Sequence, residues 1–139
     1  MKNKICFALI AAFGLSLAGC KTREGAYEPV NTSKFDLENR ERFVLMDPDA
    51  QRSVTLGGPI QEGVTSDGRL EVVANVRNRE NRRIQVQVNC VFKDAQGFST
   101  GDETPWQTLI LTENSQEAVR FISMNDKARR YTIRVRQAR

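Results

Sequence analysis

Histidine is absent from this sequence of 139 residues. Triads of the Ser-His-Asp and Cys-His types are therefore excluded, and so are the common zinc sites that bind the metal through imidazole. Carboxylate chemistry remains open in principle. Glycine-rich phosphate loops, internal repeats and low-complexity tracts are also lacking. We predict no catalytic constellation, no metal site and no dissociable cofactor.

Long apolar runs are missing except at the amino terminus. There, Lys2 and Lys4 precede an apolar run, Ile5–Ala18, which is the layout of an export signal. The run is shorter than the roughly 20 residues of a membrane-spanning helix. It ends in Leu17-Ala18-Gly19-Cys20, which resembles the lipobox of bacterial lipoprotein precursors. We predict a signal peptide over residues 1–19. The alternative is an ordinary signal peptide that happens to end in cysteine.

The lipobox resemblance makes Cys20 the lipidation site. It implies a diacylglycerol and an N-acyl chain on Cys20, the only non-protein groups that we expect. Buried acyl chains contribute about 0.8 kcal/mol per CH₂, and two or more chains anchor a protein stably. Lys21, rather than Asp, follows the cysteine. In a Gram-negative host this implies the outer membrane, with the protein facing the periplasm. In a Gram-positive host, the protein would lie on the outer face of the single membrane.

Cysteine is scarce, at three residues. Cys6 leaves with the signal peptide and Cys20 is acylated, so Cys90 remains alone and no intramolecular disulfide can form. Cys90 lies in an alternating apolar series. A lone cysteine in that setting behaves as a small hydrophobic residue more often than as a nucleophile. We therefore predict a core position for Cys90.

The net charge gives little support for a nucleic-acid partner. Without Lys2 and Lys4 the mature chain has 19 basic and 17 acidic residues, a balance of +2. Arginine is nevertheless unusually abundant, with 15 residues against 4 lysines in the mature chain. The arginines gather in two clusters: Arg77, Arg79, Arg82 and Arg83 around a predicted hairpin, and Arg129, Arg130, Arg134, Arg136 and Arg139 near the carboxyl end.

Residues 20–42 form the lipidated amino terminus and a polar tether. The segment has no clean hydrophobic period, and we expect a short helical turn near Asp36–Arg40. A flexible coil of this length averages about 25 Å between its ends, enough to hold a domain away from the membrane. The alternative is that part of the segment lies along the folded domain as an edge strand.

From Phe43 to Arg139 the pattern changes to short alternating runs separated by turn residues. In the clearest run, Ile84–Phe92, the apolar side chains fall on every second position. Period-two alternation predicts half-buried strands rather than helices. Asn125–Arg129 could form one helical turn, and Asp47-Pro48-Asp49 reads as a turn. We expect about seven strands, near residues 43–46, 53–56, 70–77, 84–93, 106–111, 119–122 and 131–136.

The number of strands and their turn spacing predict an all-β domain over residues 43–139. Clean alternation is typical of antiparallel sheets with one face in water. The spacing suits an immunoglobulin-like antiparallel β-sandwich of about seven strands, here without the disulfide. A small β-barrel is the alternative.

Part of the domain resembles a known family. Asn78-Arg79-Glu80, the long strand from Gln87, and the turn Phe92-Lys93-Asp94-Ala95-Gln96-Gly97 resemble the YcfL-like family of bacterial lipoproteins. Trp106 and the closing strand Tyr131–Arg136 add to this resemblance, which covers roughly residues 70–139. Lys93 replaces a frequent aromatic residue, and Asn89 and Cys90 also depart from the pattern. The resemblance implies a lipoprotein sandwich and supplies no catalytic residue.

Four residues are candidates for partner binding: Arg134, Arg136, Trp106 and Phe98. Arg134 and Arg136 point the same way from the last strand, and guanidinium groups match carboxylate or phosphate oxygens. Alternatively, they only solubilise a strand. Trp106 and Phe98 could present an aromatic surface, or could pack in the core or at its rim.

We predict a non-enzymatic envelope lipoprotein, attached to the membrane by its lipid, that binds another envelope protein or a cell-wall component such as peptidoglycan. The alternative is a lipid-anchored carbohydrate-binding or hydrolytic module. It would use exposed aromatics together with the loop carboxylates of Asp94, Asp102 and Glu103, as paired acids act in glycosidases.

Overall fold

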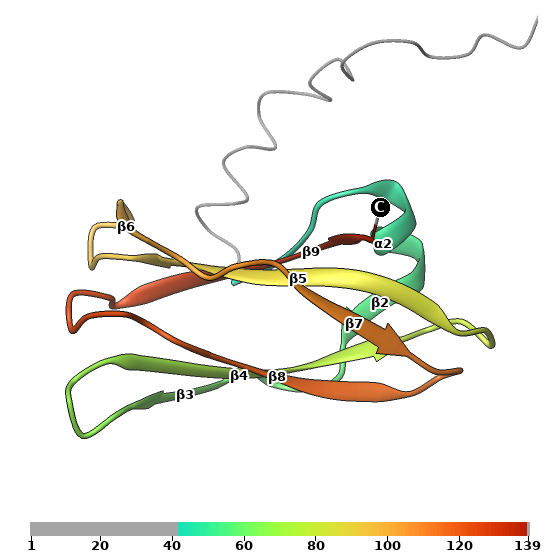
Figure 1. Ribbon diagram of the computed structural model, residues 1–139, viewed down its shortest axis with the longest axis horizontal. Coiled ribbons are helices and arrows are strands. Elements are labelled where there is room, and N and C mark those ends of the chain that lie inside the picture. The colour runs from blue at the N-terminus through green and yellow to red at the C-terminus, as the bar shows by residue number, and fades with distance from the viewer. Residues whose placement is uncertain (1–41, 139) are drawn as a thin grey trace, which may run out of the picture. The chain divides into compact units, whose positions relative to one another are not determined.

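The computed structural model describes residues 42–138, which fold into two β-sheets packed face to face (Figure 1). The predicted all-β sandwich is confirmed, and Cys90 is a free thiol. Cys20, the predicted signal peptide and all of the predicted tether except Arg42 lie outside the described residues. Within residues 42–138, no helix has the length and apolar character needed to cross a membrane.

The first sheet, sheet A, is built around the long strand β5. β9 pairs with β5 antiparallel, and β1 pairs with β9 parallel. On the opposite edge of β5, β7 pairs antiparallel with the first half of the strand and β6 pairs antiparallel with its last residues. The strands of sheet A are β1 (Phe43–Leu45), β5 (Ile84–Lys93), β6 (Ser99–Glu103), β7 (Gln107–Leu111) and β9 (Arg130–Gln137).

The second sheet, sheet B, is built around β4. β8 pairs with one edge of β4, and β2 and β3 follow one another along the other edge, all antiparallel. The strands are β2 (Val54–Leu56), β3 (Gln61–Val64), β4 (Leu70–Asn78) and β8 (Gln116–Ile122).

The described residues thus contain nine strands that occupy seven strand positions. Thr104-Pro105 separates β6 from β7, because proline has no backbone N–H to donate to the ladder. A segment with two glycines and a proline, residues 57–60, separates β2 from β3 in the same way. The expected number of about seven corresponds to these positions, but β3 and β6 were not predicted as strands.

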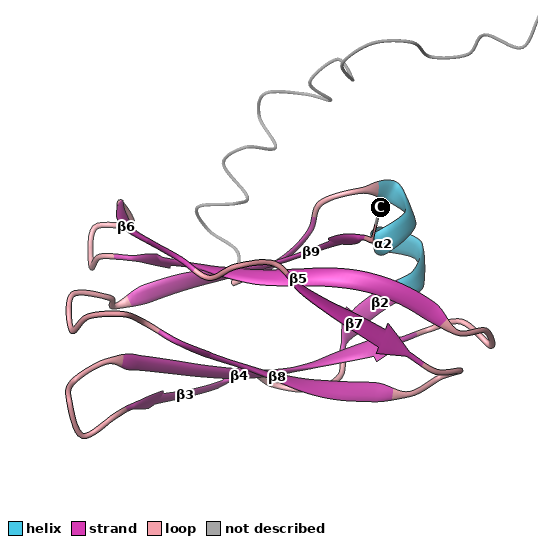
Figure 2. Ribbon diagram, viewed as in Figure 1, coloured by secondary structure: helices cyan, strands magenta, loops and turns pink. Residues whose placement is uncertain are grey.

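Two local predictions are wrong. Residues 47–49 do not form a simple turn but begin a short helix, α2 (Pro48–Ser53; Figure 2). Asp47 is its N-cap, and its side chain accepts a hydrogen bond from the backbone N–H of Ala50 at 2.8 Å, while Pro48 has the fixed φ that suits the first helical position. In contrast, residues 125–129 contain a bend and a turn but no helix.

The core lies between the two sheets and is formed by the apolar positions predicted from the alternation. Phe92, Phe121, Leu111 and Ile133 are its largest fully buried apolar side chains. Cys90 is fully buried among them, as predicted, and burial raises the pKa of its thiol to about 12. A thiol that ionises so reluctantly is a poor nucleophile.

Polar side chains close the core beside β3. The Tyr131 hydroxyl donates a hydrogen bond to Glu62 Oε1 at 2.8 Å, and Arg42 forms an ion pair with the same carboxylate. The Arg42 guanidinium also lies 5.8 Å from the centroid of the Tyr131 ring. Burial, together with the Glu62 contact, raises the pKa of Tyr131. The cluster ties sheet A to sheet B where the described chain begins.

Candidate functional site

The outward side of β5 is less solvated than the alternation predicts. Asn89 is fully buried and Lys93 is 7% exposed, although both lie opposite the core-facing positions. Lys93 donates a hydrogen bond to Thr132 Oγ1 at 2.9 Å. The expectation of a water-facing surface is therefore wrong at these two positions, because neighbouring side chains cover them.

Trp106 lies on this outward side, in the link between β6 and β7, and contacts two arginines of β9. The Arg136 guanidinium carbon lies 3.9 Å from the centroid of the indole ring, and that of Arg134 lies 5.4 Å away. Both distances are within the range of cation–π attraction. Three of the four predicted binding residues therefore come together on sheet A.

Arg134 belongs to a polar network with Asn89 and Glu103. Its Nε donates to Asn89 Oδ1 at 3.0 Å, and its Nη2 forms an ion pair with Glu103. Asn89 Nδ2 donates in turn to Glu103 Oε1 at 2.7 Å. The Arg134 side chain is only 16% exposed. These bonds explain how Asn89 is buried without leaving its amide unsatisfied.

Arg136 is held differently. Its Nε donates to Gln87 Oε1 at 3.0 Å, and its guanidinium stacks on Trp106. Gln87 is its cross-strand partner on β5, so the contact follows from the register of the sheet. We use the name Trp106 face for the set of Gln87, Asn89, Glu103, Trp106, Arg134 and Arg136.

Apolar side chains border the Trp106 face. Ile110 is 44% exposed and lies on β7, two residues beyond Thr108, which pairs with Gln87. Met46 is 47% exposed and follows Leu45, whose side chain packs on the core. The backbone N–H of Met46 donates to the carbonyl of Val135, next to Arg136. The face therefore combines arginine, tryptophan and partly exposed apolar groups.

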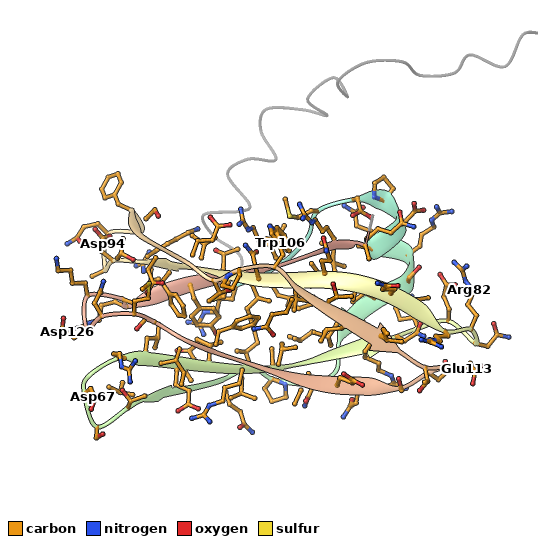
Figure 3. All side chains as sticks on the ribbon, in the orientation of Figure 1. Asp67, Arg82, Asp94, Trp106, Glu113 and Asp126 are labelled. Carbon is orange, nitrogen blue, oxygen red and sulfur yellow. The ribbon has the colours of Figure 1, made fainter. Side chains whose placement is uncertain are left out.

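Phe98, the fourth predicted binding residue, is not part of this face. It lies in the turn between β5 and β6 and is 73% exposed. Asp94, in the same turn, marks one end of the sandwich in Figure 3, whereas Trp106 lies near its middle. Phe98 and Trp106 therefore do not form one aromatic surface.

Of the three carboxylates predicted to lie in loops, Asp102 and Glu103 instead lie on β6, and all three have a structural partner. Asp94 accepts hydrogen bonds from the backbone N–H groups of Gln96 and Phe98, both at 2.9 Å, and so shapes the turn. Asp102 is buried and accepts from the backbone N–H of Met124. Glu103 pairs with Arg134. Among residues 42–138, no cluster of three or more potential metal ligands occurs.

Comparison with known proteins places the chain in a family. The model of DUF1425, a protein family of unknown function, matches residues 41–137. The chain belongs to the DUF1425 family. The comparison with curated proteins gave no match.

Two solved structures support the fold of this DUF1425 chain. Campylobacter jejuni cj0090 aligns with a TM-score of 0.56 and 17% identity, over 70% of this chain and 98% of that one. A DUF1425 family member from Shewanella sp. pv-4 aligns with a TM-score of 0.54 and 23% identity, over 62% of this chain and 77% of that one. At such identities the likeness shows the fold alone.

The hairpin between β4 and β5 carries the first arginine cluster of this DUF1425 chain. Buried Asn78 fixes the hairpin by donating to the carbonyls of Arg82 and Thr112, at 2.7 and 2.8 Å. The Glu80 carboxylate accepts hydrogen bonds from Arg82 and Ser53. The hydrogen bond from Arg82 is the main cause of the lowered pKa of Glu80. Arg82 thus has a local partner in Glu80. Arg82 and Arg83 also line part of a hollow of about 310 Å³ beside the hairpin.

Sequence reasoning missed the partners that organise the Trp106 face. Asn89 and Glu103 did not enter the predicted site, because Asn89 appeared to face water and Glu103 to lie in a loop. The sequence did contain a signal for these partners: Asn89 lies in the middle of the longest strand. A buried amide at such a position requires hydrogen-bond partners. Pairing of β6 with β5 brings Glu103 to Asn89.

Proposed function

We propose that this DUF1425 chain is a lipid-anchored, non-enzymatic lipoprotein of the cell envelope. Its sandwich binds another envelope protein or a cell-wall component through the Trp106 face. The observation that carries the proposal is the stacking of Arg134 and Arg136 on Trp106, outside the core. Side chains fixed in this way lose little conformational entropy on binding.

The composition of the face supports recognition of a partner. Tryptophan and arginine dominate the energetics of protein interfaces, and methionine is enriched there. The Trp106 face has two arginines on one tryptophan, with Met46 and Ile110 partly exposed beside it. A sheet presents them on a rigid support, so a partner would meet a prearranged surface.

The anchor is proposed from the sequence. Leu17-Ala18-Gly19-Cys20 resembles a lipobox, and the YcfL-like resemblance points to the same class of exported lipoprotein. Lys21 favours the outer membrane, facing the periplasm, in a Gram-negative host. The acyl chains on Cys20 would then hold the protein at the membrane, and the tether would give the sandwich its reach.

The carbohydrate-binding or hydrolytic alternative gains no support from the site. A sugar that stacks on Trp106 would compete with a guanidinium 3.9 Å from the ring centroid. The carboxylates of Asp94, Asp102 and Glu103 are each bonded to backbone or arginine groups.

Crosslinking in cells tests the face. Replacing Thr108, which is exposed on β7, by a photoreactive benzoyl-phenylalanine should give discrete adducts. The same replacement at Glu117, exposed on β8 of sheet B, is the matched control. Adducts at position 108 should disappear in the Arg134→Ala/Arg136→Ala variant. Equal adducts at both positions, or adducts that survive the double substitution, would contradict a binding role for the Trp106 face.

Lipid labelling tests the anchor. Cys20→Ser should abolish incorporation of a fatty-acid analogue and move the protein to the soluble fraction, because the thiol that carries the acyl chains is lost. Cys6→Ser is the matched control, since Cys6 lies within the predicted signal peptide, and should leave labelling intact. Labelling that persists in Cys20→Ser would refute the anchor.

A further inference from the structure

We propose that Arg136 is the residue of the Trp106 face that receives a carboxylate from an acidic protein partner, and that Arg134 is a positioning residue. The inference rests on the proposed function, since it assumes that this face binds. It assigns different roles to Arg134 and Arg136, which the alternation of the strand does not distinguish.

The two guanidinium groups differ in what occupies their nitrogens. Arg134 uses Nε for Asn89 and Nη2 for Glu103, so its charge is already matched by a carboxylate. Arg136 uses only Nε, which bonds the neutral amide of Gln87. Within the described part of the chain, no carboxylate pairs with Arg136. Its terminal nitrogens therefore keep their capacity to donate.

The guanidinium of Arg136 is held in a defined plane. Gln87 fixes one edge of the group and the indole of Trp106 lies against it, at 3.9 Å from the ring centroid. The free edge presents the two Nη groups, which together match the two oxygens of a carboxylate. Arginine side chains normally lose much rotamer freedom on binding, and this one is already restrained.

A protein is favoured as the source of the carboxylate. Partly exposed Met46, directly after β1, and Ile110, on β7, lie either side of Arg136 and Gln87. Apolar groups around a charged anchor exclude water from it, as they do in protein interfaces. A sugar chain would instead require a free aromatic face, and Arg136 already lies over a face of the Trp106 ring. An acidic side chain set among apolar ones is the complement of this surface.

Trp106 provides a direct readout, because it is the only tryptophan of the chain. The lipidated protein in detergent micelles is titrated with acetylated tetraglutamate amide while the indole emission is followed. We expect a saturable change, because a carboxylate on Arg136 alters the charge stacked on the ring. Tetraglutamine amide, which is neutral and of the same length, should give no saturable change. Added salt should weaken the response.

Three variants separate binding from folding. Arg136→Gln should lower the affinity for tetraglutamate at least tenfold, and Arg136→Lys, which keeps the charge but not the fork, by a smaller factor. Arg83→Gln removes an exposed arginine from the β4–β5 hairpin and should stay within twofold of the wild type. Circular dichroism and thermal unfolding of each variant show whether the sandwich is intact.

The inference is overturned if folded Arg136→Gln responds like the wild type, or if the wild type shows no saturable response. Tighter binding of N-acetylmuramyl dipeptide than of tetraglutamate would overturn the protein partner, and tighter binding of inorganic phosphate would overturn the carboxylate. If crosslinks at position 108 persist while these titrations fail, only this inference is wrong. If the crosslinks are absent, the proposed function itself fails.

Discussion

The two sides of β5 are buried in different ways. On the inner side, Val88, Cys90 and Phe92 are fully buried by other apolar side chains. On the outer side, Asn89 is just as completely buried, but by Arg134 and Glu103, with which it shares hydrogen bonds. Alternation along a strand thus separates apolar from polar positions, which is not the same as separating buried from exposed ones.

The difference matters for the energetics of each side. Removing an apolar side chain from the inner side leaves a cavity, with a penalty that grows with the lost volume. Removing a polar group from the outer side leaves its partners without hydrogen bonds in a place that water reaches poorly. Substitutions on the two sides of β5 should therefore destabilise the fold by different amounts.

The inner side should give the largest loss of stability. Phe92→Ala should lower the free energy of unfolding by about 3–5 kcal/mol, because the ring is fully buried between the sheets. Phe98→Ala is the matched control: its ring is 73% exposed, and the change should stay within about 0.5 kcal/mol. Urea denaturation followed by circular dichroism measures both. Similar losses in the two variants would contradict the assigned core.

The outer side should give a smaller but distinct loss. Asn89→Ala should lower the free energy of unfolding by about 1–3 kcal/mol, since it strips Arg134 and Glu103 of a shared partner. Asn75→Ala removes the same side chain from a half-buried position on β4 of sheet B and should have an effect within about 0.5 kcal/mol. If Asn89→Ala proved as mild as Asn75→Ala in urea denaturation, the outer side would be an ordinary solvated surface.

Cys90 gives the inner side a pH signature. Its thiol pKa is about 12 in the folded protein against an ordinary 9.0, so the unfolded chain ionises first as the pH rises. The Cys90 contribution is complete below pH 9 and falls by about 1 kcal/mol between pH 9 and 10. Tyr131, whose pKa is also raised, adds its own loss at higher pH.

Urea denaturation of the wild type and Cys90→Ala at pH 8, 9 and 10 measures this loss. The variant should be less stable at pH 8 but should lose less stability between pH 9 and 10. An identical decline in both proteins would mean that Cys90 is not the group responsible.

Much of the fold was predictable because each long strand shows its own period. β4, β5 and β9 alternate over many residues, so their inward side chains follow directly from the sequence. β3 and β6 were missed because short, polar edge strands have no apolar period and exist only through pairing with β4 and β5. In α2, the start signal was present: Asp47 followed by Pro48 is typical of an N-cap and first helical position.

The candidate site was predictable only in part. The spacing of Arg134 and Arg136 places them on one side of a strand, and the structure confirms this arrangement. Their contact with Trp106 depends on β7 and β9 lying on opposite edges of β5, which is a non-local property that no single segment encodes. Asn89 could not be recognised as buried until its partners on β6 and β9 were known.

The smallest expected effect is the difference between two ion pairs on the outer sides of the two sheets. The side chains of Arg120 and Glu71 on sheet B are 62% and 25% exposed. Their coupling in a double-mutant cycle with alanine should be about 0.2–1 kcal/mol. Arg134 is 16% exposed and Glu103 49%, and Arg134 is also bonded to Asn89, so the coupling between Arg134 and Glu103 should exceed that of the pair on sheet B.

Repeating both cycles at high salt sharpens the contrast, because screening weakens solvated pairs more than covered ones. The coupling between Arg120 and Glu71 should fall towards zero in 1 M salt, whereas that between Arg134 and Glu103 should largely persist. We expect Trp106 to make the difference, since its ring lies against the Arg134 guanidinium. Trp106→Ala should therefore render the Arg134–Glu103 coupling as salt-sensitive as the pair on sheet B, and an unchanged coupling would show that the ring does not shield it.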